Sequence, residues 1–139
     1  MADRKQVSAA IKGVTQAPRK VSLVASLVRG RSVADALTIL DHTPKRAALA
    51  VKKAIASAKA NAVNTHKLDE KSLVVSSLSV TTGTRLKRYR AGARGMAKPY
   101  QKKTSHIHVA VSGELKAVKK PAEKSTKLRT ANGSAKEEK

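Results

Sequence analysis

The sequence contains no cysteine, no phenylalanine and no tryptophan, and its only aromatic residues of the Phe, Trp or Tyr type are Tyr89 and Tyr100. The absence of cysteine excludes a disulfide scaffold, a thiol enzyme and a cysteine-based zinc site. Two tyrosines are too few for the aromatic platforms on which many RNA-binding and single-strand-binding proteins stack bases. No apolar run approaches the roughly 18–20 residues of a membrane span. Residues Met1–Lys5 lead into no apolar core, so we expect no signal peptide.

Acidic residues are also scarce. The chain has 9 Asp and Glu against 30 Lys and Arg, which gives a formal net charge of +21. No acid occurs from Lys71 to Gly113 or from His42 to Leu68. Such like charge repels itself in a compact state, and ordinary surfaces mix both signs. We therefore expect a polyanionic partner, with nucleic acid as the first candidate and an anionic membrane surface as the second.

Few residues in the sequence are candidates for metal binding or catalysis. His106 and His108 share one face of an expected strand, while His42 and His66 lie elsewhere and no acid is near the pair in sequence. Metal sites need three or four donors, so these histidines predict hydrogen-bonded or RNA-facing side chains and no metal or cofactor. No acid is placed to orient a histidine, and no serine has the context of a nucleophile elbow. We therefore expect a protein that is not an enzyme.

The 139 residues, 40% of them hydrophobic, predict one α+β domain over residues 1–115. Residues 1–6 are polar and predict a frayed end. Residues 116–139 are dominated by Lys, Ala, Glu, Ser and Thr without periodicity, which predicts a disordered basic tail.

Three helices are expected. The first begins at Pro18 and ends before Gly30, and the second begins after Ser32, with Asp35 completing a variant of the capping box. Thr43 is expected to cap the third, which continues to about Val63 with Pro44 in its first turn. The apolar stripes are, in order, Val21, Val24, Leu27, Val28; Val33, Ala36, Leu37, Leu40; and Ala47, Val51, Ala54, Ile55, Ala58, Ala62.

Period-two patterns predict an antiparallel sheet packed on these helices. Val7 to Val14 predicts a short edge strand. In the next strand Val74, Leu78 and Val80 are expected on one face and Val75, Ser77 and Ser79 on the other. In the last strand, which ends at Gly113, Ile107, Val109 and Val111 alternate with His106, His108 and Ala110.

Between these strands, residues 84–103 are strongly basic, show no apolar face that could be buried in a core and carry turn formers at Gly92 and Gly95. Continuation of both strands predicts a hairpin over about 82–104 with arms of roughly 30 Å. A two-stranded ribbon is marginal alone, and its open edges favour pairing. We therefore expect a polyanion to surround it, and mobility in the free protein. A merely solvated loop is the alternative.

The two glycines enclose Gly92-Ala93-Arg94-Gly95, which has the spacing of a backbone-clamping GXXG loop. That loop joins two helices, and the flanks here are strand-like. We therefore interpret the glycines as turn formers that take positive φ, with Gly95 also allowing close approach of another backbone.

Phosphate recognition is assigned to basic side chains, because guanidinium groups bind two phosphate oxygens at once. On the ribbon the predicted RNA-binding residues are Arg85, Lys87, Arg88, Arg90, Arg94, Lys98, Lys102 and Lys103. On the body they are Arg19, Lys20 and a row seven residues apart on the third helix, Lys45, Lys52 and Lys59.

Several segments resemble, in order and spacing, the bacterial form of the large-subunit ribosomal protein twenty-two family, over about residues 7–113. They are Pro18-Arg19-Lys20-Val21, Leu27-Val28-Arg29-Gly30-Arg31, Ala36-Leu37-Thr38-Ile39-Leu40, Val51-Lys52-Lys53, Ser57-Ala58-Lys59-Ala60-Asn61-Ala62 and Lys103-Thr104-Ser105-His106-Ile107. Leu86-Lys87-Arg88 and Ala93-Arg94-Gly95 match the family's Met-Lys-Arg and Ala-Lys-Gly.

The resemblance implies three helices on a small sheet with a long hairpin, in a non-enzymatic protein of the cytoplasmic ribosome that binds large-subunit ribosomal RNA and supports assembly. It further implies that the body sits near the tunnel exit and that the hairpin tip, here Gly92, Ala93, Arg94, Gly95 and Met96, lines the nascent-peptide tunnel. The implied partners are ribosomal RNA, neighbouring ribosomal proteins and the nascent peptide. Neither a membrane partner nor a homo-oligomer is expected.

Two departures from the family pattern stand out. Gly92 and Met96 replace arginines at the tip, and Ala17 replaces the usual serine before Pro18, which removes a helix cap.

Two alternative functions remain open on the residues alone. One is a DNA-packaging protein that inserts Met96 and Pro99 as minor-groove wedges. The other is a peripheral membrane protein, for which the ribbon has few apolar anchors.

Overall fold

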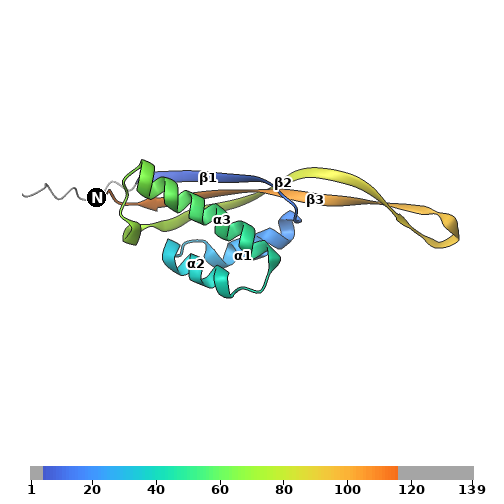
Figure 1. Ribbon diagram of the computed structural model, residues 1–139, viewed down its shortest axis with the longest axis horizontal. Coiled ribbons are helices and arrows are strands. Elements are labelled where there is room, and N and C mark those ends of the chain that lie inside the picture. The colour runs from blue at the N-terminus through green and yellow to red at the C-terminus, as the bar shows by residue number, and fades with distance from the viewer. Residues whose placement is uncertain (1–4, 116–139) are drawn as a thin grey trace, which may run out of the picture.

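A computed structural model describes residues 5–115 of the chain. Three helices cover one face of a three-stranded sheet, and two of the strands continue far beyond the body as a twisted ribbon (Figure 1). This is the expected α+β arrangement. The disordered tail predicted for residues 116–139, and hence the domain boundary, lies outside the described residues.

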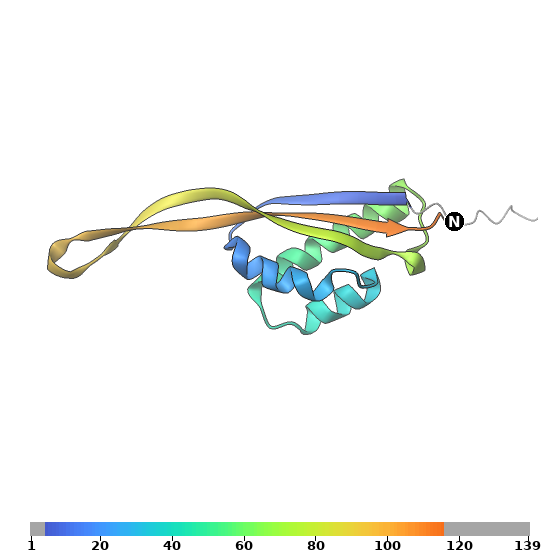
Figure 2. The same ribbon diagram turned by 180° about the vertical axis from the view of Figure 1, so that it is seen from behind.

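The sheet has the strand order β1-β3-β2, with β1 (Lys5–Val14) and β2 (Val74–Ala91) each antiparallel to β3 (Ala97–Gly113). The edge position of β1 is confirmed. It begins at Lys5, so the prediction of a frayed end is wrong for Lys5 and Gln6, which pair with Gly113 and Ser112. Seen from behind, the strands lie in front of α3 (Figure 2).

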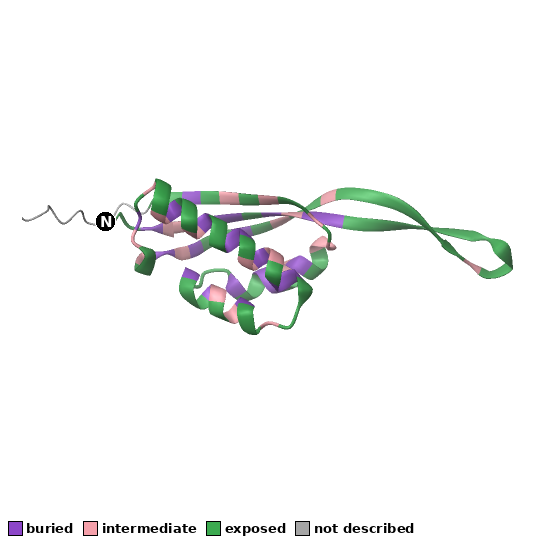
Figure 3. Ribbon diagram, in the orientation of Figure 1, coloured by how far each residue is buried: buried purple, intermediate pink, exposed green. Residues whose placement is uncertain are grey.

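The helices are α1 (Pro18–Val28), α2 (Val33–His42) and α3 (Arg46–Ala60), and a π-helical turn, η1 (Asn61–Thr65), extends α3. Their small and β-branched residues pack against Val7, Ile107, Val109 and Val111 of the sheet. Buried residues are confined almost entirely to this body, and the ribbon is exposed along its length (Figure 3). None of the helices among residues 5–115 is long and apolar enough to cross a membrane.

Helix ends follow the expected capping in two cases. The Ser32 hydroxyl accepts a hydrogen bond from the Asp35 amide and donates one to the Asp35 carboxylate, at 3.2 and 2.7 Å. Gly30 follows α1 with a φ of 72°, as predicted. Along α1, however, Leu27 is half exposed and Ala25 is buried instead.

The predicted start of α3 is wrong. Thr43 does not cap α3: its hydroxyl donates to the Ile39 carbonyl at 2.7 Å and its amide to Leu40, so Thr43 closes α2. Pro44 lies in the connection, and α3 begins at Arg46 without a side-chain cap. A threonine between two helices can serve either one, and the residue spacing did not distinguish them.

The predicted facing of β2 is wrong at its start. Val75 and Leu78 are both buried, whereas Val74 is only partly so. The cause is a bulge between Val75 and Ser77, where one extra residue reverses the alternation. The inward set of β3 matches the prediction, because Ile107, Val109 and Val111 are all buried.

The ribbon leaves the body where β1 ends. Val14 and Thr82 pair with Ser105 from opposite sides, and beyond this level only β2 and β3 remain paired. A second irregularity in β2 lies between Thr82 and Arg85. The two-stranded ribbon therefore begins close to the residue 82 boundary that the sequence predicted.

Candidate nucleic-acid interface

The register of β2 and β3 determines which ribbon side chains share a face, because directly opposed residues in an antiparallel pair project the same way. One face, which we call the cationic face, carries Leu86 opposite Lys102, Arg88 opposite Tyr100, and Arg90 opposite Lys98. It extends the full length of the ribbon. The guanidinium of Arg90 lies over the ring of Tyr100, 5.3 Å from its centroid, which holds both side chains against this face.

The other face, which we call the mixed face, changes character along its length. Near the body it carries Arg85 opposite Lys103 and Lys87 opposite Gln101. Towards the tip it carries Tyr89 opposite Pro99 and Ala91 opposite Ala97. Tyr89 is 73% exposed. The distal third of this face therefore carries two adjacent uncharged pairs. All four residues are exposed, which agrees with the prediction that no face of the ribbon is buried in a core.

The tip is a single 3₁₀ turn, η3 (Ala93–Gly95), closed by a hydrogen bond from the Gly92 amide to the Met96 carbonyl at 2.7 Å. Gly95 has the predicted positive φ, 69°, but open space surrounds it, so the predicted close approach of another backbone is wrong there. Gly92 has a φ of −122°, so the prediction of positive φ is wrong for Gly92. The close backbone approach is instead at Gly92, where a Cβ would lie 2.8 Å from the Met96 carbonyl oxygen. Arg94 takes the second left-handed conformation of the turn, with φ 57° and ψ 35°.

The base of the ribbon and the first turn of α1 together enclose a cavity of about 480 Å³. Four of the predicted RNA-binding residues meet there: Arg19 and Lys20 from α1, and Arg85 and Lys103 from the ribbon. They lie far apart in sequence, and the fold brings them to one place. Sequence reasoning missed Leu23, which lines the same cavity. The sequence did contain a signal for it, because Leu23 is a large apolar residue of α1 that the predicted apolar stripe leaves out.

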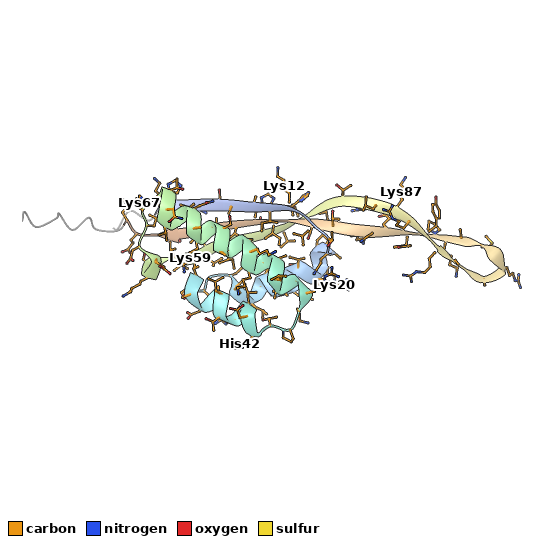
Figure 4. All side chains as sticks on the ribbon, viewed as in Figure 1. Lys12, Lys20, His42, Lys59, Lys67 and Lys87 are labelled. Carbon is orange, nitrogen blue, oxygen red and sulfur yellow. The ribbon has the colours of Figure 1, made fainter. Side chains whose placement is uncertain are left out.

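The three lysines predicted on α3 are placed differently from the ribbon cations. Lys52 pairs with Asp41 of α2, and Lys59 pairs with Glu70. Lys45 precedes α3 and is exposed. Figure 4 shows Lys59 near the end of the body away from the ribbon, whereas Lys20 lies close to the ribbon's base and Lys87 on the ribbon itself. The structure therefore separates Lys59 from the main cationic surface and pairs both Lys52 and Lys59 with acids.

The two histidines of β3 lie on the sheet face opposite the helices. The Nδ1 atom of His106 accepts a hydrogen bond from the Gly13 amide at 2.9 Å, and His108 is exposed. His106 therefore has a structural role in fixing the end of β1. Across residues 5–115 no three His, Cys, Asp or Glu side chains gather as a metal site would require.

Comparison with known proteins gives one family and a clear relative. The family described as ribosomal protein L22p/L17e matches residues 9–112. The large ribosomal subunit protein uL22 of Pediococcus pentosaceus is 49% identical over 104 residues, which span 75% of this chain and 88% of that protein. The matched range contains the whole ribbon and the cavity at its base.

Proposed function

This chain belongs to the ribosomal protein L22p/L17e family, and from that premise we propose that its ribbon threads through large-subunit ribosomal RNA and lines the nascent-peptide tunnel with its tip. The family makes the chain a structural, non-enzymatic constituent of the ribosome that binds ribosomal RNA. Its place in the cytoplasmic ribosome follows from the same membership. The path of the ribbon and the position of its tip are the proposed refinement.

The observation that carries the proposal is the composition of the ribbon. Eight cations and no acid occupy residues 85–103, and every one of these cations is exposed. Such a surface is suited to close RNA packing on both faces, because phosphates relieve the repulsion between neighbouring strands. Phosphate contacts fix position rather than read sequence, so the shape of the RNA would provide specificity.

The tip supports a position in a confined passage. Gly92, Ala93 and Gly95 carry little or no side chain, and Met96 is 68% exposed. A narrow turn of this kind presents backbone, the exposed Arg94 cation and one flexible apolar side chain to whatever passes it. Neighbouring ribosomal proteins and the nascent peptide are accordingly proposed as partners. The family match favours ribosomal RNA over the DNA-packaging and membrane alternatives.

Two measurements test the proposal at its two levels. Gradient sedimentation of cell lysate at high salt, with and without ribonuclease, should show the protein moving with the large subunit until the RNA is digested. A photoreactive residue at Met96 should then crosslink to a radiolabelled nascent chain in stalled ribosomes, whereas the same residue at Leu49 of α3 should not. Salt-resistant co-sedimentation without a Met96 crosslink would overturn the tunnel position and leave RNA binding intact.

A further inference from the structure

The cavity at the base of the ribbon has two chemically different parts. Its apolar part comes from Ala17, Pro18 and Leu23, and Leu23 is 64% exposed. An exposed leucine in a concave site is more informative than one on a convex surface, because a ligand can cover it from several sides. Thr82, Gly83 and Thr104 complete the wall on the ribbon side.

The same cavity is also lined by cations. Arg19, Lys20, Arg85 and Lys103 contribute to its lining, and no acid of residues 5–115 does. None of these four side chains forms an ion pair with an acid in the range 5–115. Arg85 and Lys103 are also directly opposed in the ribbon, an arrangement that is destabilising until an anion lies between or beside the two charges.

A cavity lined both by apolar residues and by cations without an acidic partner in the range 5–115 matches one component of RNA. A nucleotide offers a flat, largely apolar base flanked by phosphates on both sides, and a volume of 480 Å³ is in the range of small-ligand sites. A base within a helix has both of its faces covered by neighbouring bases. Only an unpaired nucleotide, in a bulge or loop, can place its base in a protein pocket.

We propose that this cavity binds one unpaired nucleotide of ribosomal RNA, with the base against Leu23 and Pro18 and the flanking phosphates on Arg19, Lys20, Arg85 and Lys103. The inference rests on the proposed RNA binding and names the RNA feature that one part of the surface selects. Because α1 belongs to the body and Arg85 and Lys103 to the ribbon, a nucleotide held between them also fixes the angle at which the ribbon leaves the body.

The test compares two short RNA hairpins that differ in one base. One carries a single-nucleotide bulge, and the other carries an abasic ribose at the same bulge, so the number of phosphates is the same. The full chain is titrated against each RNA, and affinity is measured by fluorescence anisotropy. We expect a preference of about fivefold for the bulge that retains its base, since burial of a base against apolar side chains is the only difference.

Leu23→Ala should reduce this preference to less than about twofold without changing the salt dependence of binding, because it removes apolar contact and no charge. Leu49→Ala is the matched control, since Leu49 is a helical leucine of similar exposure, 61%, that does not line the cavity. Both side chains are exposed, so both variants should keep the wild-type unfolding temperature.

The outcomes separate the two proposals. Equal affinity for the intact and abasic bulges, with steep salt dependence retained, would overturn the nucleotide pocket and leave the proposed function standing. Weak, salt-insensitive binding to both RNAs would contradict the proposed function itself. A photoreactive residue at Leu23 that crosslinks, in assembled subunits, to a neighbouring protein instead of RNA would also overturn the pocket.

Discussion

Gly83 lies so close to Thr104 that a Cβ built on the glycine would stand 2.5 Å from the threonine hydroxyl oxygen. That hydroxyl is held in place, because it donates a hydrogen bond to the Thr84 carbonyl at 2.7 Å. The contact sits at the irregularity between Thr82 and Arg85, where the ribbon leaves the sheet. The glycine thus allows β2 and β3 to approach closely at the ribbon's base.

Gly83→Ala should therefore lower the free energy of unfolding by about 1–3 kcal/mol, the usual cost of forcing an extra methyl group into a packed site. Without the steric conflict the change would be favourable, since alanine suits a strand better than glycine does. Urea unfolding of the full chain measures the effect.

A double-mutant cycle with Thr104→Ala identifies the cause. In that background the oxygen is gone, so Gly83→Ala should cost less than about 1 kcal/mol, with the His106 ring at 3.2 Å as the remaining close neighbour. If Gly83→Ala is equally costly in both backgrounds, the contact with Thr104 is not the reason for the glycine.

The start of α1 offers a stabilising change. Ala17 has the extended backbone of an N-cap residue, with φ −67° and ψ 137°, but no side-chain cap. Ala17→Ser should raise the free energy of unfolding by about 0.5–1 kcal/mol, because the hydroxyl can accept a hydrogen bond from the first turn. Thermal and urea unfolding provide the measurement.

Ser32→Ala is the matched control for Ala17→Ser. It removes an existing cap on α2 and should destabilise the protein by a similar amount. The Lys20 amide already donates a 3₁₀-type hydrogen bond to the Ala17 carbonyl at 3.0 Å. If Ala17→Ser is neutral while Ser32→Ala is destabilising, that bond already satisfies the amide that a serine cap would have satisfied.

The body could be predicted from sequence because its signals are local. Ser32 with Asp35, and Gly30 at a positive φ, each act within a few residues, and the structure confirms both. The errors arose where a residue had two local options or where an irregularity had no sequence marker. Thr43 lies between two helices and could cap either one, and the bulge after Val75 contains neither glycine nor proline.

The candidate interface was predicted as a list of cations but not as a surface. The faces of the ribbon depend on the pairing of Arg85 with Lys103, which follows the irregularity at Gly83. A glycine inside a strand is typical of such an irregularity but does not specify the register that follows it. The ion pairs of Lys52 and Lys59 involve acids about eleven residues away, so helix periodicity could not show them. The cavity joins α1 to the ribbon across more than sixty residues of sequence.

These placements predict that the ribbon and α3 contribute unequally to RNA binding. Arg88→Ala or Lys102→Ala, on the cationic face, should each reduce the slope of log affinity against log salt by about 0.7–0.9, the value for one phosphate contact. Lys52→Ala and Lys59→Ala should change it by less, since Asp41 and Glu70 already neutralise these lysines. Filter binding to ribosomal RNA over a range of salt concentrations measures the slopes.

The control for the α3 lysines is removal of their acidic partners. Asp41→Asn and Glu70→Gln should steepen the salt dependence if Lys52 and Lys59 are then free to contact RNA. Equal reductions for the ribbon and α3 variants would show instead that RNA competes successfully for the paired lysines, and that both surfaces contact phosphate.

The turn at the ribbon tip combines a charged side chain with a backbone conformation that glycine and asparagine favour. Arg94 sits at φ 57° and ψ 35°, where L residues lose about 1–2 kcal/mol, and a β-branched side chain is especially unfavourable. Arg94→Gly should keep the turn while removing one cation. Arg94→Val should open it, because a two-stranded ribbon has no packed core to compensate.

Amide hydrogen exchange at Gly92 and Met96 reports directly on this turn, because these amides donate to the Met96 and Ala93 carbonyls at 2.7 and 3.2 Å. We expect protection to be unchanged or increased in Arg94→Gly and reduced several-fold in Arg94→Val, with amides of the body unaffected in both. If the two variants exchange alike, the left-handed conformation of Arg94 does not hold the tip together. The tip would then owe its shape to Gly92, whose close approach to Met96 is the remaining local constraint.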